Sequence, residues 1–343
     1  MNRHLILLSL AQGMFLTNNV TFIAINGLVG LSLAPLGWMA TLPVMGYVVG
    51  GALSTGLVAK TQQRFGRKGS FLLGLLVALL SAGLGAWAVM IQSFWLVVTA
   101  TVVAGYYSAN AQLYRFAAAE LCAPEFREKA VSLVMAGGLI GAVIGPNLAM
   151  VTKNMLPMPF AGAYVALAAI AVVSMCLMAF IQFPPAPTAQ ASDGPGRPLR
   201  DIMLQPVFMV AALAAALGYG VMNLLMAATP LAMQVCGLPF ESTAWVLEWH
   251  VLPVMGVGVL LNLGCIFVAL LGTDLNYFLG ALFLLGVGWN FLFTGSTTLS
   301  MQAYTPQEKN RAQAAINFCV FATMAVTSFA SGALAWLKWR KAP

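Results

Sequence analysis

The chain has 343 residues, of which 61% are hydrophobic and only 7% are charged, and its mean hydropathy is +0.89. Soluble globular domains carry about 25% charged residues, so this composition excludes a water-exposed fold and indicates that lipid is the solvent. The formal net charge of +7 is scattered over short segments without a basic face or interleaved aromatic residues, which argues against nucleic acid as a partner.

Long apolar runs recur along the whole chain. A membrane-spanning helix needs about 20 apolar residues, whereas the alternating segments of about ten residues that form transmembrane barrels do not occur. We therefore predict an all-α polytopic membrane protein with about 10–11 transmembrane helices. The predicted spans cover residues 5–33, 36–58, 70–91, 93–120, 129–151, 158–183, 204–233, 243–272, 276–303 and 311–336.

One polar segment, residues 184–201, divides the chain. It is rich in Pro, Gly and small polar residues, which is typical of a flexible linker. Six predicted spans precede it. We therefore predict an N-terminal half over residues 1–183, a cytoplasmic linker, and a C-terminal half over residues 202–343.

Basic residues predict the orientation. They follow the second and fourth spans and occupy the linker, at positions Lys60, Arg64, Arg67, Lys68, Arg127, Lys129, Arg197 and Arg200. The intervening segments carry almost none. By the positive-inside rule, the N-terminus and the linker are expected to be cytoplasmic, in a bacterial cytoplasmic (inner) membrane.

The two halves share an internal repeat. Gly13 and Asn18 of the first span match Gly218 and Asn223, and the pentad Leu-Pro-Val-Met-Gly at 42–46 recurs at 252–256. The offset between matches then falls from about 210 to about 183 residues. We interpret this as about 27 residues missing from the second half between 256 and 277, and the counterpart of the sixth span is missing as well.

Two parallel repeats of helices are the architecture of the major facilitator superfamily, and the chain resembles a transporter of that family with a shortened C-terminal half. The segment Gln63, Arg64, Phe65, Gly66, Arg67, Lys68 resembles the family's D-R-x-G-R-R loop signature, with Gln63 at the acidic position. The resemblance implies a role in closing the cytoplasmic side. A role in setting the topology is the alternative.

A second motif lies in the fifth span, where Gly137, Gly138, Gly141, Gly145 and Pro146 resemble the glycine–proline motif of the antiporter branch. This resemblance implies kinking at a gate and favours efflux, whereas close helix packing without gating is the alternative. Arg115, near the end of the fourth span, is interpreted as a side chain that snorkels to the cytoplasmic surface.

Alternating access requires a polar site at mid-membrane between the halves. Amide and aromatic side chains inside the spans are the candidates, because amides both donate and accept hydrogen bonds. Each can instead serve as interhelical hydrogen-bond glue. The substrate-binding candidates are Asn18, Asn19, Tyr106, Asn110, Asn223, His250, Trp289, Asn290 and Asn317.

Glu248 is the candidate for proton coupling, because an ionisable group inside a span is a functional candidate by default and burial favours its protonated form. The alternatives place Glu248 near the outer surface and make His250 a neutral packing residue. Whether residues 243–272 cross the membrane once or return is left open. A return places the C-terminal tail outside and the segment 305–313 in the cytoplasm.

No P-loop, zinc-protease or serine-hydrolase motif occurs, and the five cysteines are widely separated. We therefore expect neither an enzyme nor a cofactor or metal. The favoured function is secondary active transport of a small solute by alternating access, with proton-coupled efflux as its finer form. The alternative is a degenerate relative that does not transport and acts as a membrane scaffold or sensor. The expected partners are the solute, the lipid bilayer and protons, and a monomer is expected.

Overall fold

The computed structural model describes residues 2–184, 197–235, 258–272 and 274–339, with the side chains of 331–339 and of scattered positions elsewhere left aside. These residues form helices joined by short connections, without a strand among them, which confirms the all-α prediction. In this part of the chain, seven helices are long and apolar enough to cross a membrane.

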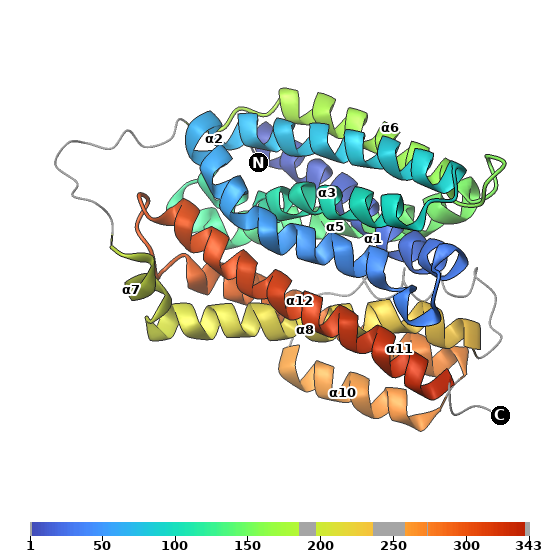
Figure 1. Cartoon of the computed structure of the whole chain (residues 1–343). Coiled ribbons are helices and arrows are strands. Elements are labelled where there is room, and N and C mark those ends of the chain that lie inside the picture. The colour runs from blue at the N-terminus through green and yellow to red at the C-terminus, as the bar shows by residue number, and fades with distance from the viewer. Residues whose placement is uncertain (1, 185–196, 236–257, 273, 340–343) are drawn as a thin grey trace.

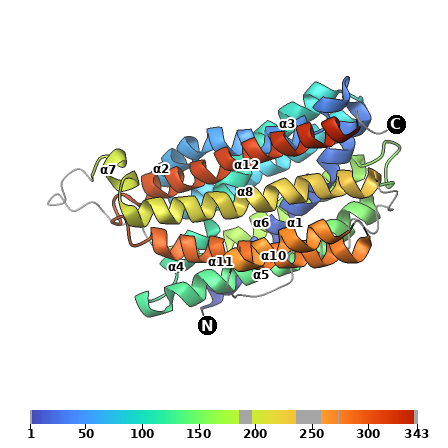
Figure 2. The same cartoon turned by 90° about the horizontal axis from the view of Figure 1, so that it is seen from below.

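Helices run nearly parallel to one long axis (Figures 1 and 2). Before the linker the elements are α1 (Arg3–Leu33), η1 (Gly37–Met39), α2 (Leu42–Met90), α3 (Phe94–Ala111), α4 (Tyr114–Glu120), η2 (Pro124–Phe126), α5 (Arg127–Thr152) and α6 (Ala161–Ala179). After it come α7 (Leu199–Met203), α8 (Pro206–Val235), α10 (Gly258–Leu271), α11 (Leu275–Ser300) and α12 (Lys309–Trp339).

Helix α2 contains two of the predicted spans. Its 49 residues would measure about 74 Å if straight, far more than a bilayer core of about 30 Å. The chain reverses at Gly66, whose φ of 68° and ψ of −177° suit glycine because it has no Cβ. Figure 1 shows α2 running to one end of the bundle and back. The predicted loop over 59–69 is therefore helical almost up to its turn.

The linker end of the bundle also holds the connection between α11 and α12. Arg197 forms an ion pair with Glu308, with 2.8 Å between Nη2 and Oε2, and Gln205 Nε2 donates to the carbonyl of Ala303 at 2.9 Å. Helix α12 then runs to the opposite end (Figure 1). The segment that begins at Thr305 therefore lies at the linker end of the bundle.

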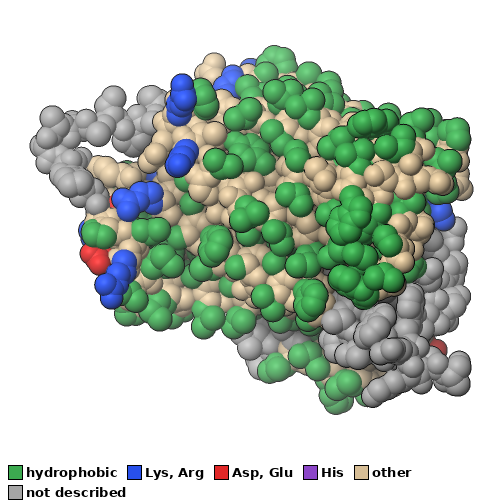
Figure 3. All heavy atoms as spheres, in the orientation of Figure 1, with side chains coloured by type: hydrophobic (Ala, Val, Ile, Leu, Met, Phe, Trp, Pro, Cys, Tyr) green, Lys and Arg blue, Asp and Glu red, His purple; other side chains and the backbone are tan. Residues whose placement is uncertain are grey.

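Helix α12 packs along α2, α1 packs along α5, and α8 packs against both α11 and α12. Contacts of α12 with α2 and of α11 with α5 join the two halves. Figure 3 shows apolar side chains over the flanks of the bundle, while most of the visible Lys and Arg side chains gather at the linker end. This is the surface expected of helices that face lipid and end in water.

Candidate functional site

Arg115, at the start of α4, lies between the halves and is only 2% exposed. Its Nη2 donates to Oδ1 of Asn317 in α12 at 2.9 Å, and its Nη1 donates to Oε1 of Gln112 at 3.3 Å. The prediction that Arg115 snorkels to the surface is wrong, because the guanidinium is buried between the halves and takes one acceptor from each, Gln112 from its own half and Asn317 from the other.

Aromatic side chains of the C-terminal half surround this guanidinium. Arg115 Cζ lies 3.8 Å from the ring centroid of Phe293, within cation–π range. Trp289 stacks on Phe293 with centroids 5.5 Å apart, and Tyr219 contacts both rings edge-on. Gln112 Nε2 donates to the Tyr219 hydroxyl at 3.0 Å. We call these six residues the inter-half cluster: Gln112, Arg115, Tyr219, Trp289, Phe293 and Asn317.

Two buried donors of the inter-half cluster lack a partner. In the part of the chain that the structure describes, Arg115 Nε and Trp289 Nε1 make no hydrogen bond, and the only other such side-chain atom is Ser174 Oγ. No carboxylate of the described residues pairs with Arg115 either. An unsatisfied buried donor costs about 1–3 kcal/mol. The cluster is therefore ready to receive hydrogen-bond acceptors from a ligand.

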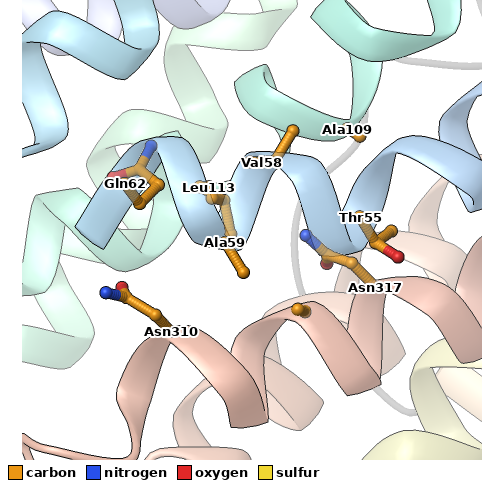
Figure 4. Close-up of a pocket in the computed structure, with 9 residues that line it drawn as sticks. Thr55, Val58, Ala59, Gln62, Ala109, Leu113, Asn310 and Asn317 are labelled. Carbon is orange, nitrogen blue, oxygen red and sulfur yellow. The ribbon is translucent and has the colours of Figure 1, made fainter. Parts of the chain in front are cut away.

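A small cavity adjoins the cluster between α2, α3 and α12 (Figure 4). In the close-up, Asn317 and Thr55 lie toward one end and Gln62 and Asn310 toward the other. The cavity holds about 10 Å³, which is room for about one water molecule. Ligand pockets measure about 300–1,000 Å³, so the halves must separate before a solute can reach the cluster.

A charged network closes the linker end. Arg67 is bidentate to Glu120, with Nη2–Oε1 at 2.7 Å and Nε–Oε2 at 3.2 Å. Both residues belong to the N-terminal half, and each also bonds to a residue of α12 in the C-terminal half. Arg67 Nη2 donates to Gln313 Oε1 at 2.8 Å, and Lys309 Nζ donates to Glu120 Oε1 at 3.2 Å. These two bonds join α12 to the N-terminal half.

The other residues of the loop signature lie apart from this network. Gln63 and Arg64 are exposed, and the Arg64 guanidinium lies over the Phe65 ring. Lys68 Nζ donates to the carbonyl of Ala179 at the end of α6. Of the basic residues in the signature, Arg67 is therefore the one that reaches the opposite half.

The glycine–proline motif packs α5 against α1. A Cβ on Gly141 would lie 2.4 Å from the Gly13 carbonyl oxygen, and one on Gly145 would lie 3.1 Å from Val20 Cβ. Pro146 stands inside α5, which continues to Thr152. The glycines therefore allow two backbones to touch, and their role in gating stays a prediction.

Several predicted binding residues bond within their own half. Asn19 Nδ2 donates to the Tyr47 hydroxyl at 3.2 Å, and Tyr106 bonds the Thr61 hydroxyl at 3.0 Å. Asn110 bonds Gln62 and Ser70, and Asn223 donates to Met324, Thr327 and Ser328 of α12.

Asn18 is buried in α1. Glu248, His250 and the side chain of Asn290 lie outside the described residues. The structure thus brings together Trp289 and Asn317.

A wider groove of about 660 Å³ opens between α5 and α11. Its lining includes Lys129 and Ser132 of α5 and Thr294 and Thr298 of α11. The groove is large enough for a small solute but open to the surroundings. Within the described part of the chain, His, Cys, Asp and Glu side chains do not gather in threes, so that part offers no metal site.

Comparisons with known proteins agree with this architecture. The model of the Major Facilitator Superfamily matches residues 5–248. The riboflavin transporter RfnT of Brucella anthropi is 32% identical over 97% of this chain and 89% of its own length. An uncharacterised transporter of the same superfamily, YdeG of Bacillus subtilis, is 27% identical over 86% of this chain and 76% of its own length.

Solved structures show the same fold. A D-xylose–proton symporter superposes with a TM-score of 0.70 at 15% identity, covering 99% of this chain and 98% of that one. The human organic anion transporter MFSD10 superposes with a TM-score of 0.67 at 14% identity, covering 98% and 95%. At such identities the likeness concerns the fold alone.

Proposed function

The chain belongs to the Major Facilitator Superfamily and transports a small solute across a membrane, and we propose that this solute is a flavin that binds at the inter-half cluster. The 32% identity to a riboflavin transporter supports the substrate class. The observation that carries the proposal is the cluster itself, in which Arg115 and Gln112 face an aromatic group from the C-terminal half.

The chemistry of the cluster suits an isoalloxazine ring. This ring is planar and presents carbonyl oxygens and ring nitrogens along its edges. Aromatic rings such as Trp289 and Phe293 offer stacking surfaces, and a guanidinium donates in a fixed planar fork. Because residues of both halves form the cluster, the contacts of a solute bound there change when the halves separate, as alternating access requires.

Uptake of labelled riboflavin tests the proposal, in a bacterial strain that can neither synthesise riboflavin nor import it. Cells that produce the wild-type chain should accumulate riboflavin and grow on micromolar amounts. Trp289→Ala should reduce initial uptake by about tenfold, since base–aromatic stacking contributes about 1–3 kcal/mol. Trp87→Ala is the matched control, because Trp87 is 56% exposed on the outer surface of α2. Uptake at the level of empty vector would contradict flavin transport.

Orientation, coupling, direction and oligomeric state belong to the proposal as well. The basic residues at the linker end support a cytoplasmic N-terminus and linker in a bacterial inner membrane. Proton coupling through Glu248 and a monomeric state stay predictions, and riboflavin accumulation in the uptake assay would contradict the outward transport predicted from the glycine–proline motif. Glu248→Gln should abolish flavin-driven proton flux in vesicles. Uptake that persists when a protonophore collapses the gradient would contradict proton coupling.

A further inference from the structure

No carboxylate of the described residues compensates the charge of Arg115. Its two Nη atoms donate to amide oxygens of Gln112 and Asn317, and its planar face lies on Phe293. Each of these partners is neutral. Membrane-buried cations normally pair with an anion or with backbone carbonyls, because the desolvation of an isolated charge is costly. Among the described residues, Arg115 therefore has no counter-ion of the kind that its burial requires.

The two unpartnered N–H donors belong to side chains that both contact the Phe293 ring. Arg115 contacts Phe293 through cation–π interaction, and Trp289 stacks on Phe293. Arg115 Nε and Trp289 Nε1 are both buried and both unpartnered in the described part of the chain. Each Nη already donates one N–H to an amide oxygen, whereas the Nε N–H donates to none, so Nε is the donor that a ligand can satisfy.

The chain as a whole favours an anion. It carries 16 Lys and Arg against 9 Asp and Glu. Lys129 lines the groove between α5 and α11, and Figure 3 shows further basic side chains at the linker end. Positive charge at a cleft raises the local concentration of anions, and Lys129 is the basic residue that lines this groove.

We propose that the inter-half cluster binds an oxyanion of the transported solute, a phosphate or carboxylate, through Arg115 Nε and Trp289 Nε1. The inference rests on the proposed function and narrows it to anionic aromatic solutes. A flavin that carries a 5′-phosphate should therefore be preferred over neutral riboflavin.

Isothermal titration of the purified full chain tests the inference with two matched ligand pairs. One pair is riboflavin and its 5′-phosphate, and the other is naphthalenemethanol and naphthoate, the carboxylate with the same carbon skeleton. Wild type should bind the anion of a pair at least about tenfold more tightly, the factor that corresponds to about 1.4 kcal/mol. Arg115→Gln should bring this ratio close to one, because it removes both the donor and the charge that favour the anion, and Arg115→Lys should retain part of the preference.

If Arg115 has a purely structural role, its substitution would weaken the binding of both members of a pair equally, and that result overturns the inference. Equal binding of the two members by wild type, or binding of neither pair, overturns it as well. If only the naphthalene anion binds, anion recognition stands and flavin transport is wrong. If riboflavin binds and its phosphate does not, flavin transport stands and anion recognition is wrong. Should the Arg115 variants fail to fold, Trp289→Phe keeps a ring, removes one donor and should reduce the preference several fold.

Discussion

Removing the charge of Lys309 should open the linker end. Lys309 donates to Glu120 across the halves at 3.2 Å, and the two side chains are 19% and 24% exposed. Exposed ion pairs contribute about 0–1 kcal/mol and hydrogen bonds to charged groups about 1.5–3 kcal/mol. The contribution of a partly buried pair lies between these two ranges, so we expect Lys309→Met to destabilise the closed state by about 1.4 kcal/mol. This free energy corresponds to about a tenfold decrease in the closed-to-open ratio. The Arg67–Glu120 pair within one half is left in place.

Cysteine labelling reads this ratio. Ala109 lines the cavity between α2, α3 and α12 and is 1% exposed, so a cysteine placed there, with the five native cysteines replaced, reacts with a maleimide when the halves part. Lys309→Met should raise the labelling rate about tenfold, in proportion to the open population. Arg311→Met is the matched control, because it removes the same charge from an exposed position on the same helix. Equal rates in wild type and Lys309→Met, or an equal rise in both variants, would refute the reasoning.

Three further predictions concern packing and pH. A Cβ on Gly51 would lie 2.6 Å from the Phe321 ring of α12, so Gly51→Ala should weaken contact between the halves by about 1–3 kcal/mol, and Phe321→Leu should restore it in a double-mutant cycle of thermal unfolding. The Cβ of Gly141→Ala would clash with backbone atoms, which no side-chain rotation can move, so this variant should lower Tm by several degrees. Gly83→Ala is the control, because open space surrounds Gly83, and its Tm should stay unchanged. Equal Tm values in the two variants would contradict the close packing of α5 on α1. Hydrogen bonds from the guanidinium at the linker lower the pKa of Glu308 to about 2. The stabilisation is then complete above about pH 4.3 and is lost as pH falls toward 2, so the Tm deficit of Glu308→Gln should be constant from pH 6 to 8 and shrink only in acid.

Helix positions followed closely from the sequence. The span predicted over 129–151 is α5 at Arg127–Thr152, because a long apolar run in lipid has no other way to satisfy its backbone. The reversal at Gly66 was less visible. Apolar periodicity stops at the basic segment, but the backbone stays helical on both sides of one glycine.

The inter-half cluster was only partly predictable. Trp289 and Asn317 stood out as polar groups in apolar spans, but Arg115 was assigned to the surface. Its partner Asn317 lies 202 positions away, and no local pattern shows which face of α4 meets α12. The same holds for Arg67, whose partner Gln313 lies 246 positions away. The sequence did offer one signal for Arg115: it is an ionisable residue inside the predicted span 93–120, and the amide of Gln112 lies three residues before it.

Riboflavin counterflow with the purified chain in proteoliposomes tests the central claim most directly, because it separates transport from metabolic trapping. Vesicles preloaded with unlabelled riboflavin should transiently accumulate labelled riboflavin from outside. Asn317→Ala removes the acceptor that holds Arg115 across the halves and should reduce the accumulation about tenfold. Asn223→Ala, whose amide bonds only within the C-terminal half, should retain most of it. No counterflow in the wild type, or undiminished counterflow in Asn317→Ala, would contradict a flavin site at the inter-half cluster.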